Sequence, residues 1–462
     1  MSNTVIVRRC EEYDREAIGA ILKQGMEMLQ YRPSGKVFVK PNVVFAFRSE
    51  IFGGNAFTAP PFVGASLSTL AGAPGVDRVD MGENCAVGMP TRLNYKHAGY
   101  YQEVKNVRSR ASRPVGIFCM DEVLRDSVFV GGNVHDNLRI SRKMARADSK
   151  VYLPKLKGHC VSNMTGAVKL NIGICSDDER AIRHDFLLNE KIVDLLTPGY
   201  PDFIAMDAID VGVGNEAFPS PRKLGLILMG DNPVAVDLIG ARLLGCGPHN
   251  VPYLKLAIER GYTPGAIEDV DLVGDITTIE DLDKHAERIH PYDDEFHRWQ
   301  DVNKELDRLK SPMRFYFGPY RHQPPKKCDT GCVMGVKMFL GSMEKFAGAE
   351  AFAKANPVVM VVGRIDETID AKGADVFLIG SCAKAKIVNA RKIKHFDKCF
   401  TTASDLNLGM ARKLGMPNVT TSMSTMLPIV GGMAAASFMK LIHGRYFQDM
   451  GHFLTKHLER RV

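Results

Sequence analysis

The last third of the sequence carries four cysteines whose spacing is typical of a metal centre. Cys328 and Cys332 lie in one predicted loop, Cys382 follows an apolar run, and Cys399 comes later in the chain. In α/β proteins, a close pair of thiols followed by single thiols at later strand ends gathers ligands for an iron–sulfur cluster or a zinc ion. Zinc ribbons normally carry two close pairs, and this chain has one. We therefore expect a four-iron, four-sulfur cluster on these cysteines, with zinc as the alternative.

A second candidate site is a polar segment in the first half of the chain. Residues 153–171 are rich in lysine and follow a predicted strand, Lys150–Leu153. Because α/β proteins place ligand sites at the carboxyl ends of strands, this segment is suited to a small anionic substrate. A helix expected to begin near Thr165 would direct free N–H groups at the same anion. A solvated basic loop is the alternative interpretation.

Polar residues at neighbouring strand ends complete this predicted cleft. Carboxylates that lie beside lysines can exchange protons, because each charge shifts the pKa of the other. Each residue taken alone is equally typical of a turn or a helix cap. We assign proton transfer to His159, Lys169 and Glu83. We assign substrate binding to Lys40, Asn42, Lys155, Lys157, Thr165 and Asp207.

Hydrophobic patterning predicts the elements that must position these residues. Buried strands alternate with amphipathic helices, which is typical of an α/β protein with a mostly parallel sheet covered by helices. We expect an α/β domain over residues 1–265, a charged helical connector over 266–312, and a smaller, flavodoxin-like α/β domain over 313–462. The predicted strands are 36–42, 76–81, 115–119, 150–153, 203–207, 224–229, 313–317, 358–362 and 376–379.

Composition restricts the partners and the compartment. The chain has 462 residues, 45% of them hydrophobic, and a net charge of +7. That charge is too modest for a nucleic-acid binder, but it suits an anionic substrate or an acidic electron-transfer protein. The N-terminus has no signal-peptide pattern, and the apolar stretch Met426–Met439 is short for a membrane span. We expect a cytoplasmic protein with reduced thiols and no membrane contact; self-association is compatible with this sequence.

Several ordered motifs resemble the uncharacterised family called domain of unknown function 362. The resemblance covers roughly residues 1–250 and implies an α/β fold, but no reaction, because the family has no general assigned activity. Its members are often joined to ferredoxin-type cluster modules, which favours a redox role. The matching segments are Lys36–Asn42, Gly82–Glu83, Pro154–His159, Thr165–Lys169, Asp207–Ala208 and Leu224–Asp237.

Two further resemblances bear on function. The segment Ile379–Ala383 is similar to a cluster-binding turn in the small subunits of nickel–iron hydrogenases. His159 and Lys169, ten residues apart, resemble a histidine and a lysine of nickel-pincer lactate racemases. The first resemblance implies an iron–sulfur cluster domain. The second implies that His159 is a proton-transfer base and that Lys169 anchors a cofactor or substrate.

Together these patterns predict an oxygen-averse iron–sulfur redox protein of the reductase type. Its small anionic substrate would lie at the interface of two α/β domains and exchange electrons with the cluster. One alternative is a non-redox isomerase, racemase or lyase that uses His159 and Lys169, with structural or zinc-binding cysteines. The other alternative is a metal-centre assembly or scaffold protein without turnover.

Overall fold

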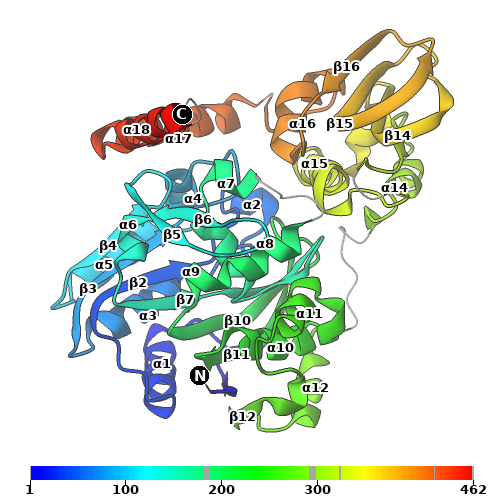
Figure 1. Ribbon diagram of the computed structural model, residues 1–462. Coiled ribbons are helices and arrows are strands. Elements are labelled where there is room, and N and C mark those ends of the chain that lie inside the picture. Colours follow the sequence, from blue (N-terminus) through cyan, green and yellow to red (C-terminus); the bar gives the residue numbers. More distant parts are fainter. Residues whose placement is uncertain (1, 182–186, 291–297, 322–323, 421, 460–462) are drawn as a thin grey trace. The chain divides into compact units, whose positions relative to one another are not determined.

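The computed structural model of the chain divides into two compact units. Unit 1 contains most of the chain, and unit 2 is a smaller body inserted between two parts of it (Figure 1). The structure describes residues 2–181, 187–290, 298–321, 324–420 and 422–459. Unit 1 comprises Met1–Arg180, Asn189–Tyr292 and Ile429–Val462, and unit 2 comprises Ala181–Leu188 and Asp293–Pro428.

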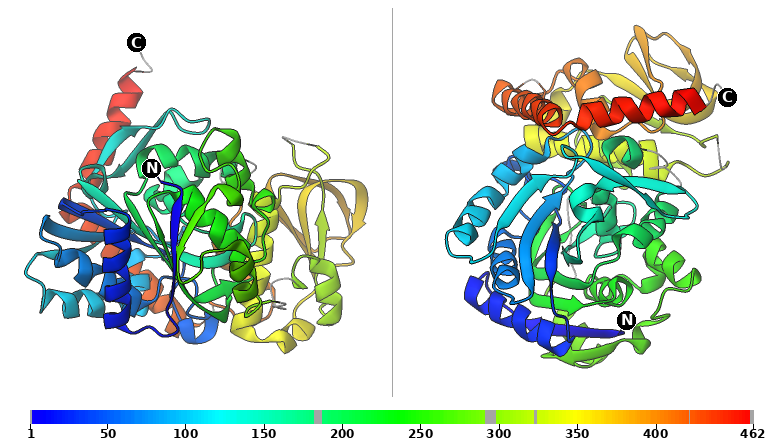
Figure 2. Two further views of the ribbon diagram at one scale, coloured as in Figure 1. Left: turned by 90° about the horizontal axis from the view of Figure 1, so that it is seen from below. Right: turned by 60° about the vertical axis from the view of Figure 1, so that its left-hand side comes forward.

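Unit 1 is built on a ten-stranded, mostly parallel sheet flanked by helices (Figure 2). The strand order is β12-β1-β11-β10-β7-β2-β3-β4, and β8 pairs with β10 and β9. Only the contacts of β11 with β1 and β10, and of β9 with β8, are antiparallel. The strands are β1 (Thr4–Arg9), β2 (Gly35–Pro41), β3 (Val76–Glu83), β4 (Val115–Cys119), β7 (Ser149–Leu153), β8 (Lys155–His159), β9 (Asn163–Thr165), β10 (Phe203–Val213), β11 (Ser220–Gly230) and β12 (Asp271–Gly274).

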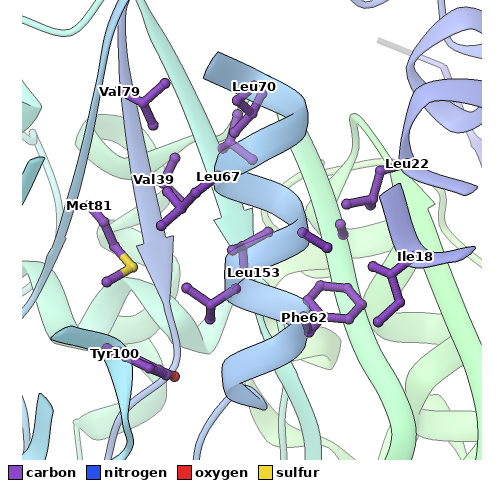
Figure 3. Close-up of a cluster of buried hydrophobic side chains, with 14 of the residues drawn as sticks. Ile18, Leu22, Val39, Phe62, Leu67, Leu70, Val79, Met81, Tyr100 and Leu153 are labelled. Atoms are coloured by element: carbon purple, nitrogen blue, oxygen red, sulfur yellow. The ribbon is translucent and has the colours of Figure 1, made fainter. Parts of the chain in front are cut away.

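The core of unit 1 follows from strands that are apolar on both faces. The last five residues of β2 are all buried, as expected where helices cover both sides of a parallel sheet. Val39 of β2 and Leu67 of α3 belong to one hydrophobic cluster, which Figure 3 shows between the strands and the helices. The larger helices of unit 1 are α1 (Arg15–Met28), α3 (Pro60–Ala71), α5 (Tyr100–Arg108), α8 (Leu188–Asp194), α10 (Pro233–Leu243), α11 (Pro252–Glu259) and α12 (Ile279–Ala286).

Unit 2 is a four-stranded parallel sheet with the order β13-β14-β15-β16. Because the strands follow chain order, the expected flavodoxin-like likeness does not extend to strand order, which in that fold begins 2-1-3. Pairing of the two long strands is interrupted after Val362 and Ile379, next to glycines with positive φ. The elements are β13 (Arg314–Phe317), β14 (Val358–Asp370), β15 (Asp375–Val388), β16 (Lys392–Phe396), α14 (Val302–Arg308), α15 (Met334–Ala347) and α16 (Ala403–Met410).

The structure divides the chain differently from the predicted domain boundaries. The expected connector, residues 266–312, is not a separate element. Its first part contributes β12 and α12 to unit 1, where β12 extends the sheet beside β1, and its last part contributes α14 to unit 2. Residues 429–462 belong to unit 1, because the C-terminal helices bind its loops, whereas we had placed them in the cysteine domain.

The apolar stretch near the C-terminus is longer than expected. It forms helix α17 (Met423–Ile442), which has 20 residues and a mean hydropathy of 1.5. By length and composition alone it is sufficient to cross a membrane, so the expectation that this stretch is too short was wrong. The apolar run extends on both sides of Met426–Met439, through Met423 and Ile442. Helix α18 (Arg445–Glu459) follows it directly.

Candidate functional site

The lysine-rich segment of unit 1 forms a buried hairpin. Strand β8 pairs with β10 on one side and with β9 on the other, so that Lys157 lies opposite Thr165. Its backbone runs close to the following loop, because a Cβ on Gly158 would lie 2.6 Å from the carbonyl oxygen of Gly214. The alternative of a solvated basic loop is therefore excluded, because this segment forms a strand. The close contact between Gly158 and Gly214 places the end of β8, with His159, against the loop that carries Glu216.

His159 and Glu216 form a buried pair at the end of this hairpin. Nδ1 of His159 accepts hydrogen bonds from the backbone N–H groups of Val161 (3.1 Å) and Ser162 (3.3 Å). This pattern leaves the ring proton on Nε2, which lies 3.5 Å from Oε1 of Glu216. The other oxygen, Oε2, accepts from the N–H of Cys160 at 3.2 Å. The pair therefore presents one N–H donor on a ring of fixed tautomer.

Burial and mutual charge set the protonation states of this group. Burial lowers the pKa of His159 to about 3, so the imidazole is neutral. Burial opposes the charged form of Glu216, but His159 and Lys169 outweigh it and lower the pKa of Glu216 to about 2. Burial also lowers the pKa of Lys169 to about 8, although the Glu216 charge opposes that shift. Lys169 can therefore gain and lose a proton near neutral pH.

A carboxylate, not a bound anion, holds the segment that leads to Lys169. Asp237 of α10 accepts hydrogen bonds from the N–H groups of Ala167 (2.6 Å) and Val168 (3.0 Å). The expected helix start near Thr165 was wrong: strand β9 ends there, and a 3₁₀ turn begins only at Lys169. The backbone donors that we expected to bind substrate are already occupied by Asp237. Their function is to position Lys169.

The predicted proton-transfer residue Glu83 lies in a buried ion pair. Nζ of Lys40 is 2.5 Å from Oε1 of Glu83, and both side chains are almost fully buried. A Cβ on Gly173 would lie 2.2 Å from that same oxygen, so the 3₁₀ turn covers the pair. Burial lowers the pKa of Lys40 and raises that of Glu83. A substrate contact at either group would require this pair to open.

Lys155 and Lys157 are also bonded inside the protein. Nζ of Lys155 is 2.9 Å from Oδ2 of Asp207, which also accepts from the N–H at the entrance of α3. Nζ of Lys157 donates to the carbonyl oxygens of Ala56 and Glu216, both at 2.7 Å. Burial lowers the pKa of Lys157 well below its ordinary range. In this arrangement Lys155 and Asp207 brace strand ends, and Lys157 anchors the loop of Glu216.

The last two predicted binding residues keep polar atoms without partners. Oδ1 of Asn42 and Oγ1 of Thr165 are buried, and neither has a hydrogen-bond partner among the residues that the structure describes. The hydroxyl of Ser162 is in the same state. Buried polar atoms normally have partners, so these three atoms are suited to a bound polar molecule.

His159, Cys160 and Glu216 also lie close enough to be tested as a metal site. Their donor atoms are all within 4.8 Å of one another. A metal on Nε2 of His159 would require the ring proton to move to Nδ1, but Nδ1 already accepts two backbone hydrogen bonds. The hydrogen bonds therefore favour a proton-transfer group over a metal centre at this place.

The four predicted cysteine ligands of unit 2 line one cavity. Cys328 and Cys332 precede α15, Cys382 lies on β15, and Cys399 follows β16; the cavity measures about 20 Å³. The glycines beside the interrupted strand pairing, Gly363 and Gly380, line it as well. A Cβ on Gly380 would lie 2.8 Å from Sγ of Cys332. The absence of a side chain at Gly380 therefore leaves room for this thiol.

The spacing of the thiols discriminates between the two expected cofactors. Tetrahedral zinc with Zn–S bonds of about 2.3 Å would bring its sulfur ligands to about 3.8 Å from one another. Within the described ranges, no three of these thiols lie within 4.8 Å of each other. A four-iron cluster spaces its thiolates more widely, because each binds a different iron. The thiols as placed therefore do not form a closed tetrahedral zinc site.

Comparison with known proteins supports the resemblance of unit 1. Residues 37–242 match the family model described as domain of unknown function (DUF362), which is less than half of the chain. The thylakoid-associated protein sll1697 of Synechocystis sp. is 25% identical over 280 residues, which cover 58% of this chain and 83% of that protein. Since that relative is named for its association with thylakoids, the expected cytoplasmic location stays a prediction.

A search of solved structures finds the lactate racemase apoprotein from Thermoanaerobacterium thermosaccharolyticum. The two chains are 13% identical with a TM-score of 0.33, and the match covers 51% of this chain and 56% of the racemase. The match thus spans little more than half of that protein, and a likeness this weak transfers no reaction. The resemblance of the cysteine domain to hydrogenase small subunits stays a prediction.

Sequence reasoning named His159, Lys169 and the four cysteines and places Glu216 at the same cleft, but it does not pair Glu216 with His159. Glu216 follows β10 in a loop with several polar residues, and nothing in its neighbours distinguishes it. The available signal was Gly158, since a Cβ at this position would lie 2.6 Å from the carbonyl oxygen of Gly214 in the loop of Glu216. Asp237 has a structural role, because it accepts hydrogen bonds from the segment that leads to Lys169.

Proposed function

We propose that unit 1 is a proton-transfer enzyme of the isomerase, racemase or lyase class that acts on a small anionic substrate. Lys169 is its acid–base group, and His159 is a neutral hydrogen-bond donor. The observation that supports this function best is the pKa of Lys169, which burial brings to about 8. General acid–base groups work best when their pKa lies near the working pH.

The two side chains divide the chemistry between them. Neutral Lys169 removes a proton from a carbon next to a carboxylate or carbonyl group, and the ammonium form returns it. His159 donates its Nε2 hydrogen bond to the oxygen on which negative charge develops. A neutral imidazole suits this role because it stabilises the oxyanion without a competing proton transfer. The N–H groups of Val161 and Ser162 hold the ring through Nδ1, and the Glu216 charge favours the ammonium form of Lys169 against the effect of burial.

Carbon–hydrogen exchange tests this proposal without knowledge of the natural substrate. The purified protein is incubated in D₂O with a panel of small hydroxy, keto and amino acids, and loss of the α-proton is followed by NMR. We expect at least one compound to exchange, and Lys169→Met to abolish that exchange. Lys23→Met, an exposed lysine on α1, is the matched control and retains it. Exchange that persists in Lys169→Met would assign the base to another residue.

A second candidate function belongs to unit 2. We propose that Cys328, Cys332, Cys382 and Cys399 hold an iron–sulfur cluster that supplies one-electron chemistry, because three separate segments bring these four thiols to one cavity. Exposed lysines on β15 and β16 would suit an acidic electron-transfer protein. In this interpretation the protein is a reductase, and the cluster exchanges electrons with the bound substrate.

Anaerobic purification tests the cluster directly. We expect a brown protein with iron and acid-labile sulfide in equal amounts, and loss of both in Cys382→Ser. Cys246→Ser in unit 1 is the matched control, because that thiol is also partly exposed. A colourless protein that contains zinc would support the alternative cofactor, and one without metal would make these cysteines structural.

A further inference from the structure

Helix α18 faces the protein with its polar side chains and faces outward with its apolar ones. Its apolar side chains follow helical spacing and are 44–64% exposed; they are Tyr446, Phe447, Met450 and Phe453. Toward unit 1, Gln448 exchanges two hydrogen bonds with the backbone of Arg125, at 2.6 and 3.0 Å. Asp449 accepts a hydrogen bond from Arg139 at 3.0 Å. A helix on the surface of a protein in water normally has the opposite arrangement.

Helix α17 continues the same apolar surface. Phe438, Leu441 and Ile442 are 50–61% exposed, and only 17% of its most apolar window is buried. Its other face is attached to unit 1: Nζ of Lys440 lies 3.9 Å from Asp121, and Nδ1 of His443 lies 3.1 Å from the carbonyl oxygen of Glu122. Most of the large exposed hydrophobic side chains of the described chain lie on these two helices.

We propose that α17 and α18 attach unit 1 to the surface of an anionic lipid bilayer. Both helices lie in the plane of the membrane, and their outward apolar side chains enter the interface between headgroups and acyl chains. Figures 1 and 2 show the two helices as consecutive rods at the C-terminus. A membrane-spanning arrangement is disfavoured, because Lys440 at the C-terminal end of α17 and His443 just beyond it are held by the loops of unit 1.

Charge favours lipid over a second copy of the chain as the occupant of this surface. In sequence, the last 23 residues contain five basic residues, Lys440, Arg445, Lys456, Arg460 and Arg461, against two acidic ones, Asp449 and Glu459. Of the basic residues, Lys440 pairs with Asp121 and Arg445 pairs with Asp449. In a symmetric dimer through this surface each positive region would face its own copy. Anionic headgroups would instead neutralise it, and each basic residue near such a surface strengthens binding.

Vesicle flotation with the full-length protein tests this inference. The protein is mixed with vesicles of phosphatidylcholine, or of phosphatidylcholine with phosphatidylglycerol, and the floating fraction is measured. We expect flotation with the anionic vesicles, and a loss of at least about tenfold in the double variant Phe447→Glu/Phe453→Glu. Both positions are exposed, so circular dichroism of the variant should match that of the wild type. Leu408→Glu on α16, 69% exposed, is the matched control and should float like the wild type.

Three results would overturn the inference. The wild-type protein could fail to float with either vesicle, or the double variant could float as well as the wild type. In the third, light scattering would detect a dimer that the double variant dissociates, while neither protein binds vesicles. That result would assign the surface to a second copy of the chain.

Discussion

Replacing Lys169 by methionine should stabilise the protein while it abolishes proton transfer. The pKa of Lys169 is about 8 in the folded chain instead of the ordinary 10.5. At about 1.36 kcal/mol per pH unit, holding this side chain charged at neutral pH costs about 3 kcal/mol of folding free energy. Methionine has a similar length and no charge, so it removes this cost.

The effect must depend on pH with a defined sign. The folded pKa lies below the unfolded one, so the unfolded chain binds more protons between about pH 8 and 10.5, and wild-type stability rises with pH across that window. We therefore expect Lys169→Met to exceed the wild type by about 3 kcal/mol at pH 7 and to lose this advantage as the pH approaches 10.5.

Urea unfolding followed by circular dichroism at pH 6 to 10 measures this difference. The exposed Lys23→Met should stay within about 0.5 kcal/mol of the wild type at every pH. A Lys169→Met variant that is no more stable than the wild type at pH 7, or a difference that does not change with pH, would refute the reasoning. Lys169 would then have its ordinary pKa, and almost none of it would be the neutral amine that the proposed base requires.

Three further predictions concern the residues around this site. Lys40→Met leaves Glu83 charged and unpaired in the interior and should destabilise the protein by about 3–5 kcal/mol, and Lys40→Met/Glu83→Met should recover most of that loss in urea unfolding. Glu216→Gln should destabilise the protein at pH 7, because neighbouring positive charge lowers the pKa of Glu216 to about 2; the deficit should shrink as the pH falls from 4.5 to 2, and a constant deficit would contradict this cause. Gly166→Ala places a Cβ 2.2 Å from Oδ1 of Asp237 and should lower the melting temperature and proton exchange together, whereas unchanged exchange would show that this contact does not position the base.

The strands of the central sheet could be predicted because their signal is local. The apolar runs at 36–42, 76–81, 115–119 and 203–207 lie in or overlap β2, β3, β4 and β10, and each is a short hydrophobic segment bounded by polar residues. Helix α10 has a local signal as well, because a capping asparagine, Asn232, is followed directly by Pro233; Asp231 does not cap the helix. Asp231 instead accepts from the hydroxyl of Ser2, a partner 229 positions away that no local pattern reveals.

The basic segment was misread because its partners are distant in sequence. Three lysines within 20 residues of a predicted strand end are typical of a solvated loop, and lysine is almost never fully buried unless it is paired. The partner of Lys155 is Asp207, and those of Lys157 are two backbone carbonyls from separate loops. Only the folded chain shows that these charges are internal. The lysines predicted to line a substrate cleft instead hold strand ends and loops together.

This difference decides which lysine can perform chemistry. Lys40, Lys155 and Lys157 each have an Nζ that is bonded to protein oxygen atoms and buried from solvent. In the part of the chain that the structure describes, no hydrogen bond or ion pair occupies Nζ of Lys169, and its side chain is only partly buried. An amine that must pick up and release a proton cannot be committed to a permanent acceptor. The same fold that uses three lysines for structure therefore leaves the fourth, beside Glu216, available for the substrate.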